Sequence, residues 1–192
     1  MMFSADSSME SQPSLTTQRL VLRPFVKTDA LRVQQLAGDI RIADVTANIP
    51  HPYPDGLAET WIGSHSEKWG RGELATFAIT IKESDLLVGC ISLMNFSHRE
   101  AEIGYWVGVD HWGNGYATET CKAIIRFGFG AMKLDRVHAH HLSRNPASGR
   151  VLAKAGLVHI GSGSAVCGYQ VREESIERYE KFNTQQHAVS SD

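Results

Sequence analysis

The stretch that most constrains the fold covers residues 110–120, DHWGNGYATET, where two glycines one residue apart precede a predicted helix. An alternating apolar segment over 101–109 predicts a strand just before it, so the local order is strand, glycine turn, helix. The first amides of a helix have no partner within it and carry partial positive charge. The turn is therefore either a plain connector with unusual backbone angles or a cradle for a phosphate group.

Two familiar phosphate-binding turns fit this stretch poorly. A Walker loop is excluded because no Gly-Lys-Ser/Thr follows the glycines. A dinucleotide-binding Rossmann turn would use Asp135, 20 residues after Gly115, for the ribose. However, Thr118 stands where the third glycine belongs, and the turn follows a predicted antiparallel meander. An NAD site is therefore the weaker alternative, and another pyrophosphate is favoured.

The rest of the chain predicts a mixed α/β domain over residues 15–183, with disordered polar tails at 1–14 and 184–192. Strands are expected at 19–25, 74–81, 86–96, 101–109 and 135–142, with two more near the C-terminus. Helices are expected at 28–38 with Thr28 as N-cap, from Asp55 to Gly70 or Gly72, from Tyr116, and at 145–156. This order predicts a sheet of about seven strands with helices on both faces.

Composition limits the partners and the compartment. A net charge of -2 without a basic block argues against nucleic acid. No apolar run approaches the roughly 18 residues of a membrane span. Three dispersed cysteines, and a start unlike a signal peptide, predict reduced thiols in the cytoplasm. A homodimer is left open.

Five motifs occur in a telling order: TTQRLVLRP at 16–24, a Pro50-x-Pro52-Tyr53 loop, EIGYW at 102–106, WGNGYA at 112–117, and an Asn145-x-x-Ser148…Leu152-x-Lys154-x-Gly156 helix. Together they resemble the GNAT N-acetyltransferase superfamily, and in particular its RimJ/RimL branch of protein N-terminal acetyltransferases. Trp112 replaces the usual Gln or Arg of the pyrophosphate loop, a departure that is also similar to that branch.

The resemblance implies a GNAT fold whose mostly antiparallel sheet is splayed at the acetyl-CoA site. It also implies direct transfer of the acetyl group to a primary amine in a ternary complex, with no metal. The residues that it assigns to acetyl-CoA are Val107 and Val109 for the pantetheine arm, Trp112, Gly113, Asn114, Gly115, Ala117 and Thr118 around the pyrophosphate, and Asn145.

Glu102 is the candidate general base. It alternates with Gly104 and Trp106 on one strand face, and apolar surroundings would raise its pKa toward the range useful for a base. A solvent-facing carboxylate is the plain alternative, and His98 and Glu100 are nearby competitors.

Ser148 is the candidate acid for the leaving thiolate. The tyrosine that many GNAT enzymes carry seven residues after the asparagine is Leu152 here. Ser148 equally suits the first turn of a helix that Asn145 caps and Pro146 begins.

The acceptor pocket is expected to include Tyr53 and Trp106, whereas Trp61 reads better as core. The run HAHH at 138–141 invites a metal interpretation, but only His138 and His140 would share a strand face. The leading acceptor is a peptide or protein N-terminal amine. The alternatives are a small amine (polyamine, amino sugar or amino acid) and a non-catalytic acyl-CoA sensor.

Overall fold

Eight strands form one sheet in the order β1-β2-β3-β4-β5-β6-β8-β7 in the computed structural model, which describes residues 11–184. They are β1 (Leu15–Thr16), β2 (Leu20–Arg23), β3 (Ala75–Ile81), β4 (Leu87–Ser97), β5 (Glu100–Val107), β6 (Arg136–Leu142), β7 (Val158–Cys167) and β8 (Arg172–Phe182). Every neighbouring pair is antiparallel except β5 and β6, which are parallel. The predicted mixed, mostly antiparallel sheet is confirmed, and the two-residue β1 adds an eighth strand.

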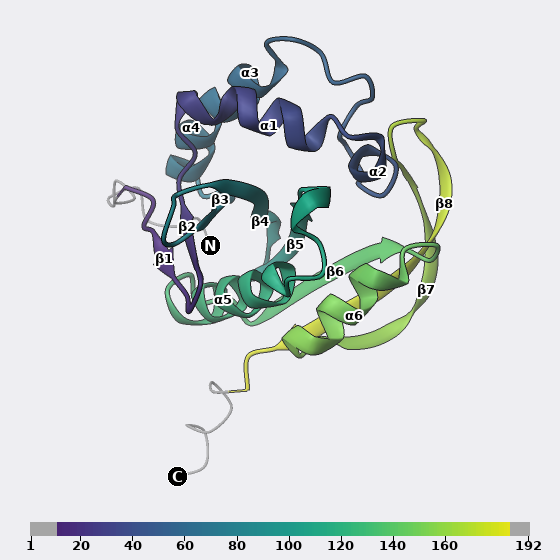
Figure 1. The fold of residues 1–192 in the computed structure, drawn as a ribbon. Coiled ribbons are helices and arrows are strands. Elements are labelled where there is room, and N and C mark those ends of the chain that lie inside the picture. Colours follow the sequence, from purple (N-terminus) through teal and green to yellow (C-terminus); the bar gives the residue numbers. More distant parts are fainter. Residues whose placement is uncertain (1–10, 185–192) are drawn as a thin grey trace.

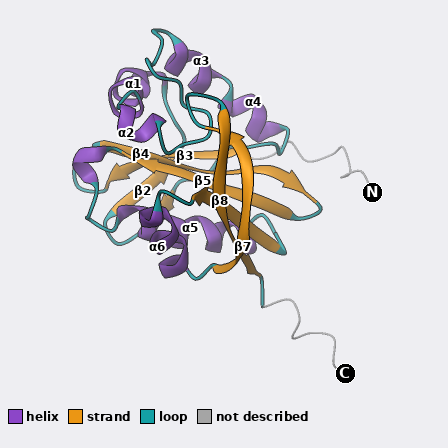
Figure 2. Cartoon of the chain, turned by 90° about the vertical axis from the view of Figure 1, so that its right-hand side faces the viewer, coloured by secondary structure: helices purple, strands orange, loops and turns teal. Residues whose placement is uncertain are grey.

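Helices cover both faces of the sheet (Figures 1 and 2). One face carries α1 (Ala30–Ala37), α2 (Ile40–Ala43), α3 (Leu57–Gly63) and α4 (His65–Gly70), and the other carries α5 (Tyr116–Gly130) and α6 (Pro146–Ala155). Short 3₁₀ turns, η1 (Lys27–Asp29) and η2 (Val109–His111), precede α1 and follow β5. None of the helices within residues 11–184 is long and apolar enough to cross a membrane.

Side chains along β5 and β6 alternate between the two faces of the sheet and pack into two separate hydrophobic clusters. Ile103 and Val107 of β5, with Val137 of β6, are buried in the larger cluster beneath α5 and α6. Trp106 points the other way and packs against the cluster formed with α1 and α3. Each fully buried aliphatic side chain contributes roughly 1.5–3 kcal/mol, so this alternation fixes which face every residue of β5 presents.

Two predicted helix boundaries are wrong. The N-cap of α1 is Asp29 rather than Thr28, because the chain first makes η1, and the Asp29 carboxylate accepts the backbone N–H of Val26 (2.9 Å). The helix expected from Asp55 to Gly70 or Gly72 is two helices that meet at Ser64. The Ser64 hydroxyl donates to the carbonyl of Trp61 (2.8 Å), an alternative bond that competes with the regular helical ladder.

Most of the two tails expected to be disordered lies outside the described residues, namely 1–10 and 185–192. Residues 11–14 have no regular secondary structure, although the Gln12 amide donates to the carbonyl of Thr76 on β3 (2.8 Å).

Candidate active site

The glycine turn opens directly into α5. Gly113 and Gly115 have φ values of +79° and +77°, in the left-handed region that favours glycine. Gly115 is the N-cap of α5, and no side chain caps that end. A Cβ at Gly113 would meet nothing within 4 Å. The turn therefore presents the uncapped positive end of a 15-residue helix, where an anion approaches the backbone without obstruction.

Two side chains hold this turn in place. The Trp112 indole N–H donates to the carbonyl of Val107 (2.6 Å), tying the turn to the end of β5. The Arg19 guanidinium donates to the carbonyl of Asn114 (2.9 Å) and to the Glu119 carboxylate (2.8 Å). Arg19 thereby neutralises the acidic residue in the first turn of α5. Sequence reasoning gave Arg19 no such role; its place within the TTQRLVLRP motif was the available signal.

The sheet opens between β5 and β6. These strands pair only over residues 100–102 and 136–138 and then diverge. The Gly108 N–H donates to the carbonyl of Val88 (2.8 Å), so the alternation of an antiparallel ladder turns the peptide groups of Tyr105 and Val107 away from β4 into the gap. Apart from the Val107 carbonyl, which accepts the Trp112 indole N–H, the Tyr105 and Val107 backbone groups on this side of β5 have no partner among the described residues. They suit an extended ligand that adds as a strand would.

The expected pantetheine residues need one correction. Strand β5 ends at Val107, so Val109 lies in η2 and not on the strand as predicted, because the chain turns after Gly108. The carbonyl of Val107 accepts the Trp112 indole, and the carbonyl of Val109 accepts the Trp112 backbone N–H (3.1 Å). Each of the two carbonyls therefore already accepts one hydrogen bond from Trp112.

Glu102 lies where the two strands begin to part, with both carboxylate oxygens engaged. His140 Nδ1 is 2.8 Å from Oε1, and the Asn95 amide donates to Oε2 (2.8 Å). The hydrogen bond with His140 is the largest cause that lowers the pKa of Glu102, and it outweighs the opposing effect of burial. The predicted rise of this pKa is therefore wrong. Of the competitors, Glu100 is bound to Arg136 (2.6 Å), and His98 lies 2.9 Å from the Ser97 hydroxyl.

Ser148 lies in the first turn of α6 and faces β5. Its hydroxyl oxygen lies 2.7 Å from that of Tyr105. Asn145 caps the helix, with Oδ1 accepting the Ser148 N–H (3.4 Å) and Pro146 in the first position, as the sequence predicted. Burial raises the pKa of Tyr105, so its phenol stays protonated. Tyr105 was missed from the sequence, because nothing local indicates that it faces α6.

Tyr53 and Trp106 both pack against the cluster between α1, α3 and the sheet, on the face that Glu102 shares with Trp106. Burial is the first cause that raises the pKa of Tyr53. Trp61 packs against the same cluster, with its ring 5.0 Å from that of Phe25, which supports its interpretation as core.

The run HAHH divides as expected. His138 and His140 lie on one face of β6, whereas His141 is buried on the other, where a Cβ on Gly149 of α6 would meet its Nε2. Among residues 11–184, no group of three or more His, Cys, Asp or Glu side chains is arranged to hold a metal ion.

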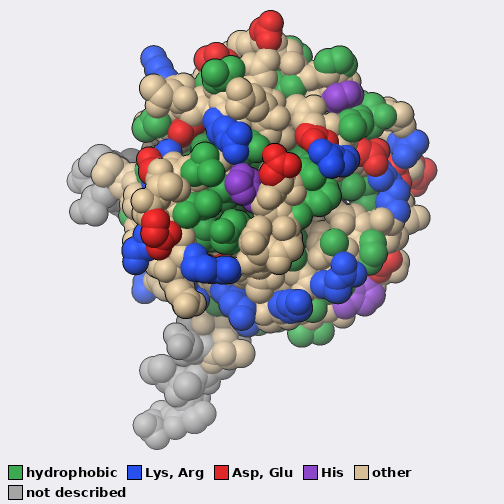
Figure 3. All heavy atoms as spheres, viewed as in Figure 1, with side chains coloured by type: hydrophobic (Ala, Val, Ile, Leu, Met, Phe, Trp, Pro, Cys, Tyr) green, Lys and Arg blue, Asp and Glu red, His purple; other side chains and the backbone are tan. Residues whose placement is uncertain are grey.

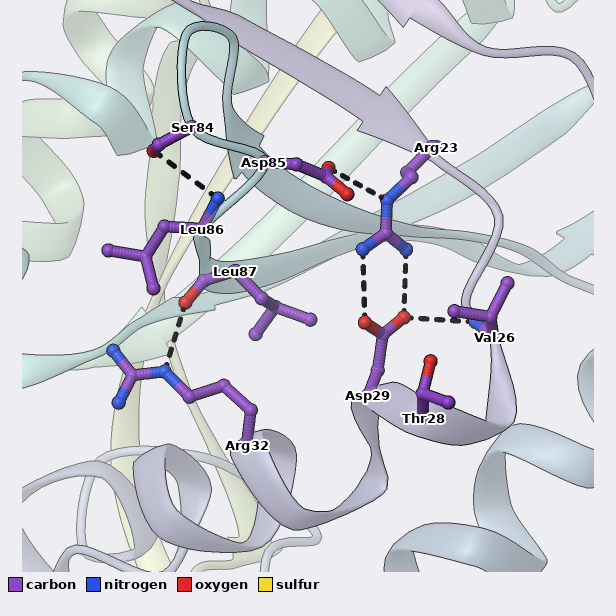
Figure 4. Close-up of a pocket in the computed structure, with 9 residues that line it drawn as sticks. All are labelled: Arg23, Val26, Thr28, Asp29, Arg32, Ser84, Asp85, Leu86 and Leu87. Atoms are coloured by element: carbon purple, nitrogen blue, oxygen red, sulfur yellow. Dashed lines mark hydrogen bonds and ion pairs between the residues drawn. The ribbon is translucent and has the colours of Figure 1, made fainter.

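A hollow that none of these residues lines lies between β2, η1 and the turn before β4 (Figure 4). Arg23 binds Asp29 there through two bonds (2.8 and 3.0 Å) and Asp85 through a third (3.2 Å), and Arg32 donates to the carbonyl of Leu87 (3.2 Å). The hydrogen bond to Asp29 is the main cause that raises the pKa of Arg23. This arrangement anchors the start of α1, and none of the predicted site residues lines the hollow.

Comparison with known proteins agrees with this geometry. The family model described as "Acetyltransferase (GNAT) domain" matches residues 19–158. The chain is 31% identical over 142 residues to the uncharacterized N-acetyltransferase p20 of Bacillus licheniformis, covering 72% of this chain and 79% of that protein.

Solved structures share the fold. The ribosomal-protein-S5-alanine acetyltransferase from Vibrio fischeri superposes with a TM-score of 0.77 at 20% identity, covering 90% of this chain and 98% of that one. The spermidine N-acetyltransferase from Vibrio cholerae, in complex with CoA and spermine, has a TM-score of 0.74 at 18% identity, with 88% and 98% covered.

The splayed sheet, the glycine turn and the matched family define an acyltransferase that uses acetyl-CoA. The chain belongs to the GNAT acetyltransferase family. It is an acetyl-CoA-dependent N-acetyltransferase whose acceptor is an amine.

Proposed function

We propose that this enzyme acetylates the N-terminal amine of a peptide or protein by direct transfer in a ternary complex. Glu102 supplies the carboxylate of the proton-accepting site, and Ser148 stabilises the leaving thiolate. The acceptor amine enters from the face that carries Glu102, Trp106 and Tyr53, opposite the face that carries α5 and α6.

Acetyl-CoA would be held by the turn and by the gap in the sheet. The amides around Gly113, Asn114, Gly115, Ala117 and Thr118 suit its pyrophosphate, since the end of α5 is uncapped and Glu119 is already paired with Arg19 (2.7 Å). The pantetheine arm would lie along β5, with the amide donors of Asn145 beside it. Acetyl-CoA brings an activated acetyl carbon; the protein orients it toward the amine.

One observation supports a peptide acceptor over a polyamine: the carboxylates on this face of β5 and β8 are paired with nitrogen atoms of neighbouring side chains. Glu100 and Glu180 both bind Arg136 (2.6 and 2.8 Å), and Glu102 binds His140. A polyamine site would need unpaired carboxylates to match several ammonium groups. On the surface in Figure 3, acidic and basic side chains are interspersed, with apolar side chains between them. Such a surface suits a peptide better than a polycation.

The chemistry makes modest demands on the acid. A thiol has a pKa of about 8.5, so a thiolate leaves near neutral pH with little help. The Ser148 hydroxyl, held by Tyr105, would supply one hydrogen bond to the developing charge. The base has the harder task, because an ammonium group is not a nucleophile until it loses a proton.

Two alternatives remain distinct. A small-molecule amine would use the same machinery, as the name of the Vibrio cholerae spermidine N-acetyltransferase illustrates for a protein of the same fold. A non-catalytic acyl-CoA sensor would bind CoA without turnover.

We expect the enzyme to act in the cytoplasm, since Cys90, Cys121 and Cys167 are free thiols. All groups named for the reaction come from one chain, so the proposal does not require a homodimer.

The test is acetyl-CoA-dependent thiol release, measured in parallel with peptides of varied first residue and with spermidine, glucosamine and free amino acids. Peptides are expected to give a kcat/KM at least about tenfold above the small amines, a difference of about 1.4 kcal/mol. Turnover with small amines alone would refute the peptide assignment. CoA binding without turnover on any amine would favour the sensor.

A further inference from the structure

The proton-accepting site contains a second group that could remove a proton. His140 Nδ1 lies 2.8 Å from Glu102 Oε1, and the side chains are 29% and 17% exposed. The second oxygen, Oε2, accepts the Asn95 amide. A carboxylate that accepts two hydrogen bonds is stabilised in its charged form, which agrees with the lowered pKa of Glu102. Such a group is a weak base toward an ammonium ion.

The opposite nitrogen of His140 is available. Nε2 of His140 has no hydrogen-bond partner among the described residues, and the ring is only partly buried. A carboxylate at Nδ1 holds the proton on that nitrogen and leaves the Nε2 lone pair directed outward. This is the tautomer that a general base needs.

The position along the strand also fits. The last paired residues of β5 and β6 are Glu102 and His138, so His140 is two residues past the point where the strands part. Its side chain is on the Glu102 face of the sheet. The gap is where the acetyl end of the donor and the amine must meet if the pantetheine arm follows β5.

We propose that His140 is the general base and that Glu102 is its positioning partner. This assignment rests on the proposed function, since it supposes that a primary amine is acetylated on this face. His140 Nε2 takes one proton from the acceptor ammonium, and the freed lone pair attacks the thioester carbonyl carbon. The C–N bond forms, the C–S bond breaks, and a second proton passes from nitrogen to the thiolate. The imidazolium then returns its proton to solvent.

Several charged groups face His140. Glu102 of β5 lies beside it, and Arg178 is its direct partner in register on β8. His138 on the same strand face lies opposite Glu180, which binds Arg136 together with Glu100.

His138 supplies a matched control. It has the same residue type, strand and face as His140, yet no hydrogen bond links it to Glu102 among the described residues. A change there alters the charge next to the pair but removes neither partner of the hydrogen bond between Glu102 and His140.

The test compares H140N, H138N and E102Q for kcat and for the pH profile of kcat/KM with the best amine. Asparagine at 140 retains an amide donor for Glu102 but no basic nitrogen. H140N is expected to lower kcat by about 100-fold or more and to abolish the acid limb of the profile, with acetyl-CoA binding unchanged. E102Q is expected to lower kcat by about tenfold, because the amide no longer fixes the proton of His140 on Nδ1. H138N is expected to stay within about threefold of the unaltered kcat.

Three results would overturn the assignment. If H140N keeps the full kcat and the acid limb while E102Q is inactive, Glu102 is itself the base, and the proposed function stands without His140. If H138N lowers kcat as much as H140N does, the loss reflects the total charge on this strand face and not a base at His140. If the unaltered enzyme acetylates no amine, the proposed function fails and this inference fails with it.

Discussion

The hydroxyl oxygens of Tyr105 and Ser148 lie 2.7 Å apart and join β5 to the first turn of α6, next to the gap in the sheet. The Tyr105 hydroxyl also donates to the Ser148 carbonyl at a longer distance (3.3 Å). Because burial keeps the Tyr105 phenol protonated, this pair holds two hydroxyl protons beside the place where the thiolate would form.

Removing the Ser148 hydroxyl should slow turnover without weakening the donor complex. S148A is expected to lower kcat by about tenfold, the value of one hydrogen bond to a developing charge, while the Kd of CoA changes less than about threefold. Y105F should cost less, since Ser148 keeps its own hydroxyl. Steady-state kinetics with calorimetric CoA titration checks both. An unchanged kcat in S148A would leave Ser148 a structural residue of the helix.

The glycine turn should not tolerate a side chain. G115A places an L residue at φ +77°, which costs about 1–2 kcal/mol in the left-handed region and puts a methyl group at the phosphate cradle. We expect CoA to bind at least about tenfold more weakly. Gly130, at the far end of α5, is the control: its φ is not positive, and a Cβ there meets nothing within 4 Å.

The Kd of CoA, measured for both variants, distinguishes a glycine turn that binds phosphate from one that only connects β5 to α5. G130A should bind CoA as the unaltered protein does. Equal CoA affinity in G115A and G130A, with G115A only less stable, would mean that the turn is a connector.

Buried His65 should make stability depend on pH. It is 6% exposed, and Phe25 and Trp61 pack around it. Neither of its ring nitrogens has a hydrogen-bond partner within residues 11–184. Burial lowers its pKa to about 4, against 6.5 for an ordinary histidine. Since the unfolded chain binds the proton first, its contribution is complete above pH 6.5 and is lost as the pH falls toward about 4.

We expect a loss of about 1–3 kcal/mol in the free energy of unfolding across that interval, measured by urea denaturation at several pH values. H65L should remove most of this slope, and H98Q, at an exposed turn, should retain it. A slope that persists unchanged in H65L would show that His65 titrates normally in the folded protein.

The sequence predicted the features that depend on residues close together along the chain, and it missed those that depend on contacts between distant segments. The glycine turn, the start of α5 at Tyr116 and the Asn145 cap are set by neighbours along the chain, and all three were predicted. The pKa of Glu102 was predicted in the wrong direction because its partners, Asn95 and His140, come from the adjacent strands β4 and β6. Alternation along β5 revealed only the apolar neighbours on the same strand.

The Tyr105–Ser148 pair shows the same limit, because 43 residues separate its members. Alternation indicated that Tyr105 faces away from Glu102, but only the packing of α6 against the sheet brings Ser148 to it. The splay between β5 and β6 came from the family resemblance; the sequence pattern alone predicted two strands without their angle.

The most direct test of the acceptor assignment is to locate the acetyl group on one peptide that carries both a free N-terminus and an internal lysine, with spermidine present in the same reaction. Tandem mass spectrometry would identify the acetylated nitrogen in each product. We predict acetyl-CoA-dependent acetylation of the α-amine, with the lysine and spermidine unmodified. Acetylated spermidine or lysine beside an unmodified N-terminus would contradict it.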